Sequence, residues 1–344
     1  MEVFLICLAR EKGENCLKYY RLWVVAFLLK FIGSAWDASY HFKYLFEEYS
    51  IPHIVNFLGF ALGGFLLFKE WRHSHYMDRF SRNLITIGYA LFLIGIPLDF
   101  SYHIKFGIDL TTWSPTHFVY YIATDIMIIG AWRGYFKYTE TEIPTWKSLH
   151  TWFAMFLLEC LVFPNMQQEN GAISYTQYIH GQSIASKEIL ELISDPASQI
   201  FGGIPQWVYP IYSVLVVTLL TVIVNRLLRD YTIPLMGATL YILLRFLYKS
   251  VFYAVHYPTS YVPITILFIP LFFLLFRKGY WLAGLIGSLS YFLTLYAINR
   301  LGILITPPVE LWEVIPVAVT GLFVPVIAAK VKHLPIIHKK KQPA

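Results

Sequence analysis

The sequence has few charged residues for its length. Of 344 residues, 14% are Asp, Glu, Lys or Arg, whereas about a quarter is usual in soluble globular domains. This shortage excludes an ordinary soluble fold, and the hydrophobic share of 57% favours an integral membrane protein. Only three cysteines are present, so a disulfide framework is excluded as the basis of the fold.

The sequence contains many long apolar runs. Ten runs are long enough to cross about 30 Å of hydrocarbon as helices, and they are continuous rather than alternating, which disfavours strands. The sequence therefore predicts an all-α, polytopic membrane bundle of about ten transmembrane helices. The predicted spans are residues 22–40, 52–68, 84–100, 115–132, 149–163, 207–224, 233–254, 262–276, 280–298 and 311–329.

Basic residues gather in alternate connections between these spans. If the first span leaves the cytoplasm, 20 of the 27 Lys and Arg residues lie on the cytoplasmic side and four on the outer side. The remaining three, Lys30, Arg245 and Lys249, lie inside spans. This bias predicts cytoplasmic termini. No cleavable signal peptide is evident, so the first span is expected to act as an uncleaved anchor, and the expected location is a prokaryotic plasma membrane. The net charge of +6 reflects this sidedness rather than nucleic-acid binding.

One segment occurs twice, each time at the turn of a hairpin of two spans. The copies read DASYHFKYLFEEYSIPH and DFSYHIKFGIDLTTWSPTH. Each has an aspartate, a histidine four residues later, and a second histidine close behind a proline. Residues four apart share a helix face, and proline suits the first turn of the next helix, so each set is expected to converge. The two sets are Asp37, His41 and His53, and Asp99, His103 and His117.

Two imidazoles and one carboxylate form a set of ligands that suits copper, zinc or non-haem iron and disfavours calcium and magnesium. Such a set leaves positions open to water, O₂ or substrate, which favours reactivity over a purely structural role. Neighbouring carboxylates could hold a ligating histidine by its other ring nitrogen. The carboxylates in question are Glu47, Glu48 and Asp109. The residues thus predict two transition-metal sites on the outer face.

The repeat divides the chain into two regions. Residues 1–135 are predicted to form a duplicated helical-hairpin metal-binding region with four spans. Residues 136–344 are predicted to form a C-terminal membrane region with six spans and an outward loop at 165–206. That loop is expected to carry a short helix over residues 187–193.

The first region resembles the C subunit of particulate methane and ammonia monooxygenases, over roughly residues 36–132. That family has DASWH at a span boundary, then an Arg-Asp pair, an aromatic residue and Pro-Ser-His. The residues that carry the resemblance are Asp37-Ala38-Ser39-Tyr40-His41 in the first copy and Asp109, Trp113 and Pro115-Thr116-His117 in the second.

The resemblance implies that the Asp37 set corresponds to the family's Asp/His/His copper site. The Asp99 set corresponds to its second, Asn/His/His site, with aspartate in place of asparagine. It also implies copper-dependent activation of O₂ and hydroxylation of a small apolar or neutral molecule. The chain would act with other membrane subunits or as a homo-oligomer. Iron and zinc are the alternative metals.

Four ionisable residues in the later spans also need partners in a membrane. We expect interhelical ion pairs among Asp125, Glu159, Arg245 and Lys249. Two other functions remain open at this point. A transporter or channel would use these four charges and would favour inverted repeats. A non-catalytic metal-storage or assembly subunit would hold metal without turnover.

Overall fold

The structure is a computed structural model, and it describes residues 2–44, 50–73, 76–106, 112–139, 146–182, 187–257 and 259–330. Within these ranges the chain is predominantly helical, which confirms the all-α prediction. The helices are α1 (Glu2–Tyr40), α2 (Ile51–His73), α3 (Arg79–Phe106), α4 (Pro115–Thr139), α5 (Trp146–Ile179), α6 (Lys187–Ile193), α7 (Val208–Leu228), α8 (Thr232–Ala254), η1 (Ile264–Leu267), α9 (Phe268–Leu275), α10 (Tyr280–Arg300), η2 (Leu311–Glu313) and α11 (Val314–Lys330).

A small antiparallel sheet joins α6 to α7. Its strands are β1 (Ser194–Asp195), β2 (Ile200–Phe201) and β3 (Ile204–Pro205), in the order β1-β2-β3. Ser194 pairs with Phe201, and Ile200 pairs with Pro205. The short helix α6 occupies the residues where the sequence predicts one.

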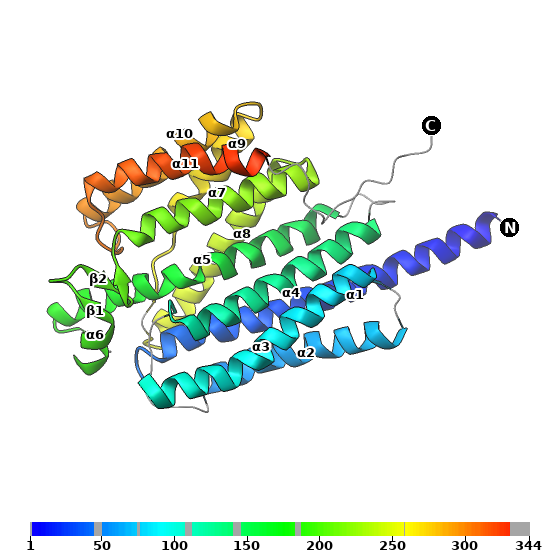
Figure 1. The fold of residues 1–344 in the computed structure, drawn as a ribbon, viewed down its shortest axis with the longest axis horizontal. Coiled ribbons are helices and arrows are strands. Elements are labelled where there is room, and N and C mark those ends of the chain that lie inside the picture. The colour runs from blue at the N-terminus through cyan, green and yellow to red at the C-terminus, as the bar shows by residue number, and fades with distance from the viewer. Residues whose placement is uncertain are drawn as a thin grey trace.

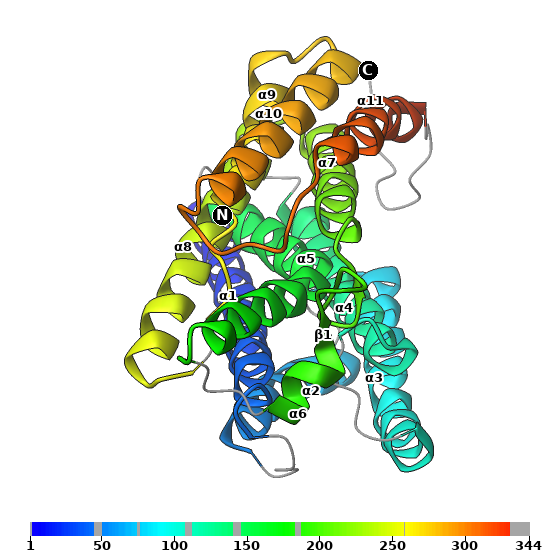
Figure 2. The ribbon, with the colours of Figure 1, turned by 90° about the vertical axis from the view of Figure 1, so that its left-hand side faces the viewer.

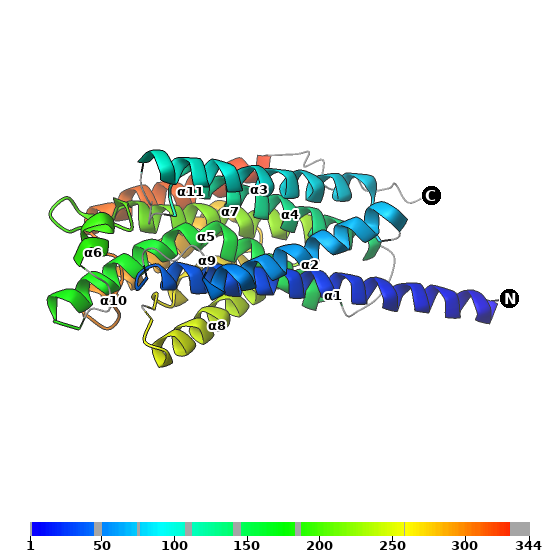
Figure 3. The same ribbon diagram turned by 90° about the horizontal axis from the view of Figure 1, so that it is seen from below.

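The long helices lie side by side with their axes roughly aligned (Figures 1 and 3). α1 begins and α11 ends toward one end of the bundle, whereas α6 and the strands lie at the other. Seen from that second end, α1–α4 lie on one side and α7, α10 and α11 on the other (Figure 2). α5 lies between the two groups and contacts α1, α4, α7 and α8. The hairpins α1–α2 and α3–α4 thus pack against helices of the second half of the chain.

Eight helices in the described ranges are long and apolar enough to cross a membrane. They correspond to eight of the ten expected spans. A ninth expected span is helix α4, which is not among these eight and contains the charged residues Asp125 and Arg133. The tenth is the η1–α9 segment Ile264–Leu275, which at 1.5 Å per residue is about 18 Å long and short of the hydrocarbon thickness. The count of ten spans therefore stays a prediction.

α5 differs most from the sequence prediction. The sequence predicts a span over 149–163 and then an outward loop, but α5 continues through Pro164 to Ile179. Polar residues of this extension, including Asn165, Gln168 and Glu169, are buried against neighbouring elements. Their polarity indicated solvent, whereas in the fold Asn165 and Glu169 bind polar groups of α7 and α8, and Gln168 donates to the Pro205 carbonyl oxygen of β3. Residues 165–179 are therefore part of the helical core.

Ion pairs fix two connections at the end of the bundle where most basic residues lie. Arg133 of α4 places Nη1 2.6 Å from both carboxylate oxygens of Asp78, which precedes α3. Burial raises the pKa of Asp78, but the guanidinium outweighs burial and holds this pKa below its usual range. Lys147 Nζ lies 2.8 Å from Asp230 Oδ2, between α7 and α8. The connections α2–α3 and α7–α8 are thereby held against α4 and α5.

The two hairpins close at matching positions. A Cβ on Gly59 of α2 would lie 2.5 Å from the Ala26 carbonyl oxygen of α1, and a Cβ on Gly88 of α3 would lie 2.7 Å from the Ala123 carbonyl oxygen of α4. Both pairs occupy the same positions relative to their copy of the repeated segment. Small residues let helix backbones approach closely in membranes. The duplication therefore includes the helix crossing as well as the repeated segment.

We predict that Gly59→Ala destabilises the α1–α2 hairpin by about 1–3 kcal/mol, because the added methyl group meets backbone that cannot move aside. Gly64→Ala is the matched control, since its Cβ would meet the movable Tyr89 ring at 3.3 Å. Thermal unfolding of the detergent-purified protein measures the effect. Equal midpoints for the two variants would contradict this account of the crossing.

Candidate metal centres

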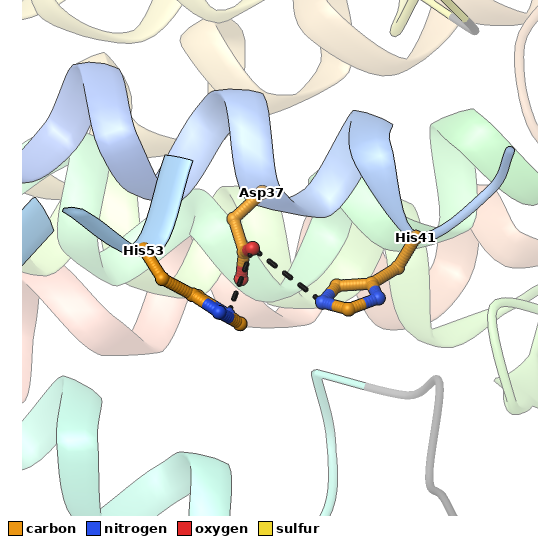
Figure 4. A group of neighbouring side chains, drawn as sticks. All are labelled: Asp37, His41 and His53. Atoms are coloured by element: carbon orange, nitrogen blue, oxygen red, sulfur yellow. Dashed lines mark ion pairs between the residues drawn. The ribbon is translucent and has the colours of Figure 1, made fainter. Parts of the chain in front are cut away.

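The first set of predicted ligands comes together at the turn of the α1–α2 hairpin. Asp37 lies in the last turn of α1, and His41 follows the end of the helix by one residue. The His41 backbone N–H still donates to the Asp37 carbonyl oxygen at 3.1 Å, so the helical spacing is kept. His41 Nε2 and His53 Nε2 lie 3.4 and 2.9 Å from Asp37 Oδ1, from either side (Figure 4). We call these three residues the Asp37 cluster.

The second set comes together in the same way at the turn of the α3–α4 hairpin. Asp99 and His103 lie in the last two turns of α3, and His117 lies in the first turn of α4. His103 Nε2 and His117 Nε2 are 3.8 and 3.9 Å from Asp99 Oδ1. We call these three residues the Asp99 cluster. α1 and α3 both end toward the end of the bundle that carries α6, so the two clusters share that end (Figures 1 and 3).

A serine places the second histidine in each hairpin. Ser50 immediately precedes α2, and Ser114 immediately precedes α4. The His53 backbone N–H lies 3.4 Å from Ser50 Oγ, and the His117 backbone N–H lies 3.3 Å from Ser114 Oγ. Each serine therefore caps its helix, with the histidine as the third helical residue. Sequence reasoning overlooked these serines, although each stands three residues before its histidine.

The geometry of both clusters fits a metal ion. Among the described residues neither Asp37 Oδ1 nor Asp99 Oδ1 accepts a hydrogen bond, although both atoms are buried. The imidazole nitrogens thus approach these oxygens without the alignment of a hydrogen bond, as ligands around a shared cation do. In each cluster one ligand atom per residue lies within 4.8 Å of the other two.

The separations compare well with real coordination spheres. Tetrahedral ligands about 2.05 Å from an ion stand about 3.3 Å apart. The Asp37 cluster already has separations of 2.9 and 3.4 Å. The Asp99 cluster, at 3.8 and 3.9 Å, needs its side chains to draw in by about half an ångström. Three protein ligands leave one position open, and the 42% exposed side chain of His53 shows that the Asp37 cluster is accessible.

Contacts with the second half of the chain hold the hairpin turns. Thr112 Oγ1 and Trp113 Nε1, which precede α4, both donate to the Pro164 carbonyl oxygen of α5, at 3.0 and 3.1 Å. Tyr40, at the end of α1, stacks on Tyr257 behind α8 with 5.9 Å between ring centroids. No sequence signal indicates these contacts, because they depend on helix packing. The carboxylates predicted to support ligating histidines lie outside the described residues; they are Glu47, Glu48 and Asp109.

The intramembrane charges pair differently from the expectation. Arg245 of α8 binds Glu169 of α5, with Nη2 2.5 Å from Oε2, and both side chains are almost fully buried. Tyr209 donates to the other oxygen of Glu169 at 2.9 Å. The sequence predicts that Arg245 pairs with Asp125 or Glu159, whereas in the structure it pairs with Glu169. Glu169 lies in the segment predicted as an outward loop, so its polarity did not mark it as a partner for a buried charge.

The other three charges stay outside this pair. Glu159 is fully buried, and neither of its carboxylate oxygens has a hydrogen-bond partner among the described residues. Asp125 of α4 lies beside Cys160 of α5, and Lys249 of α8 is half-buried. The structure thus brings Asp125 and Glu159 into the core without bringing either against a described cation at ion-pair distance.

Comparison of the chain with known proteins gives no match to a family model, a curated protein or a solved structure. The resemblance to the monooxygenase C subunit therefore stays an expectation drawn from the residues quoted for it. The functional assignment rests on those residues and on the geometry of the two clusters.

We predict that Glu169→Gln destabilises the protein by about 3–5 kcal/mol, because it leaves the buried Arg245 guanidinium without a counter-charge. Asp230→Asn removes the partner of Lys147 in a more exposed pair and should cost about 0–1 kcal/mol. Thermal or denaturant unfolding in detergent compares the two variants. A Glu169→Gln protein as stable as Asp230→Asn would show that the buried pair is not structural.

Proposed function

We propose that this chain is a membrane protein that binds copper at two sites and acts as a subunit of an O₂-activating hydroxylase complex. The observation that carries the proposal is the pair of Asp/His/His clusters at equivalent positions of two hairpins. One histidine at a membrane boundary has little meaning alone. Six residues that repeat in type, order and place, around buried carboxylate oxygens with no hydrogen-bond partner among the described residues, support a shared cation.

Copper is the metal that these ligands favour most. Imidazole suits copper, zinc and iron, and affinity among divalent first-row ions is highest for copper. Copper supplies one-electron redox chemistry when bound, which zinc does not. The resemblance of Asp37–His41 and its second copy to the copper sites of the monooxygenase C subunit supports the same choice.

The residues of each cluster would have distinct roles in holding the ion. Each aspartate supplies the negative charge that a cation needs in a poorly polar environment, and the two histidines set the ligand plane. Ser50 and Ser114 fix the helix starts and so hold the second histidines in place. The ends of transmembrane helices lie near the membrane boundary, where O₂ and lipid-soluble substrates both arrive. A small apolar or neutral substrate therefore fits this location.

Partners are part of the proposal. The described residues form helices, a six-residue sheet and the loops that join them, and no domain for a redox cofactor is found among them. Electrons would have to come from a quinol or from another protein. The chain is therefore proposed to work with other membrane subunits, in a prokaryotic plasma membrane with the clusters on the outer face.

A transporter is less favoured by the structure. Arg245, a central charge of that alternative, pairs with Glu169 and donates to Tyr241 and Ser260, which gives it a structural reason to be buried. The repeated hairpins also enter from the same end of the bundle, whereas transporters favour inverted repeats. A storage or assembly subunit would bind the same metal and differ only in lacking turnover.

We predict about two copper ions per purified chain, one for each cluster. His53→Ala and His117→Ala should each lose one ion, and the double variant should lose both. His180→Ala is the control, because His180 is exposed and belongs to neither cluster. Elemental mass spectrometry after copper reconstitution and desalting measures the content. A folded wild-type protein that retains no copper, iron or zinc would overturn the proposal.

A further inference from the structure

The two clusters have the same ligands, but the residues beneath them differ. The residues beneath a cluster form a layer one to two helical turns from the ligands, toward the middle of the bundle. Positions three and seven residues before each aspartate, and three residues after each second histidine, line this layer. The matching pairs are Ser34 and Ile96, Lys30 and Phe92, and Asn56 and Tyr120. The first hairpin is polar at all three positions, and the second is apolar or aromatic.

A hydrogen-bonded chain fills this layer beneath the Asp37 cluster. Lys30 Nζ donates to Asn56 Oδ1 at 3.2 Å, and Asn56 Nδ2 donates to Ser34 Oγ at 2.9 Å. Asn56 is held close to α1, because a Cβ on Gly33 would lie 2.4 Å from its backbone nitrogen. Since Asn56 comes one turn after His53, the ammonium lies about one turn beneath the ligands. That places it within about 10 Å of the cluster.

Two contacts of the Lys30 ammonium stabilise a cation. The side chain is 5% exposed, and its ammonium faces an amide oxygen and the face of the Phe92 ring, 4.0 Å from the centroid. Both contacts stabilise a cation. None of the ion pairs among the described residues includes Lys30. Its positive charge is therefore not cancelled by an ion pair with any carboxylate of the described residues.

The second hairpin contributes no charged residue at the matching positions, although the Lys30 ammonium reaches the Phe92 ring from the first hairpin. Phe92 and Tyr120 pack together there with ring centroids 4.8 Å apart. Gly95 makes room for this ring, since its Cβ would lie 2.9 Å from Tyr120 Cε1. Gly95 and Gly33 occupy the same place in the two copies, so the hairpins share one backbone arrangement around different side chains.

We propose that Lys30 makes the two metal centres unequal, a proposal that rests on the proposed function. Its ammonium repels a divalent ion at the Asp37 cluster more than a monovalent one. The Asp37 cluster is therefore selective for the singly charged ion, Cu(I), and the Asp99 cluster for divalent ions. Lys30 acts on the bound ion through its charge and is not itself a ligand. At this distance and an effective dielectric constant near 20, one unit charge changes the ratio of divalent to monovalent affinity roughly tenfold or more.

The test uses the full-length chain with one cluster removed at a time. His103→Ala/His117→Ala leaves the Asp37 cluster, and His41→Ala/His53→Ala leaves the Asp99 cluster. Affinities for Zn²⁺ and Cu(I) are measured against competing chelators. We expect a Zn²⁺-to-Cu(I) affinity ratio roughly tenfold or more lower for the Asp37 cluster. Equal ratios in the two proteins would overturn the inference, and this comparison needs no change at Lys30.

Substitution of Lys30 then assigns the difference to its charge. Lys30→Met should raise the Zn²⁺-to-Cu(I) affinity ratio of the Asp37 cluster roughly tenfold and change that of the Asp99 cluster less. Lys30→Gln keeps a hydrogen-bond donor for Asn56 but removes the charge, so it should change the ratio as Lys30→Met does. Lys30→Arg keeps the charge and should retain the wild-type Zn²⁺-to-Cu(I) affinity ratio. Lys249→Met is the control for loss of a lysine inside a span. An unchanged ratio in Lys30→Gln would sink this inference alone, whereas absence of metal at both clusters would sink the proposed function.

Discussion

The close approach of helices within each hairpin is the constraint on which both candidate metal centres depend. An aspartate near the end of one helix can meet a histidine at the start of the next only if the two backbones nearly touch. Gly59 against Ala26 and Gly88 against Ala123 provide that contact in the two copies. Serine caps then fix where the second helix begins. Backbone contact and helix start together set the ligand separations.

The second half of the chain gives the hairpins a fixed base. α5 is the most deeply buried of the candidate spans and contacts both hairpins. The Pro164 carbonyl oxygen of α5 holds the residues before α4, and its Glu169 binds α8 through Arg245. A long polar extension of a membrane helix is costly unless its groups are paired. Here the pairing joins the hairpin region to the later helices.

Much of this arrangement depends on local sequence and could be predicted. Apolar runs give the helices, and the spacing of Asp37, His41 and their second copy gives the convergence of ligands, because both depend on neighbours a few residues away. The extension of α5 could not be predicted, because the burial of Glu169 is decided by Arg245, far along the chain. Lys30 shows the same limit. The sequence places it inside a span, but only packing brings it to Asn56 and Phe92.

X-ray absorption spectroscopy at the copper edge of the reconstituted full-length protein tests the central claim most directly. Two imidazoles and one carboxylate predict nitrogen and oxygen neighbours at about 2.0 Å, with the outer scattering of imidazole rings and no sulfur neighbour. That pattern should vanish in the His53→Ala/His117→Ala protein. A spectrum dominated by sulfur, or one that the double variant leaves unchanged, would mean that copper binds elsewhere and that the clusters are not metal centres.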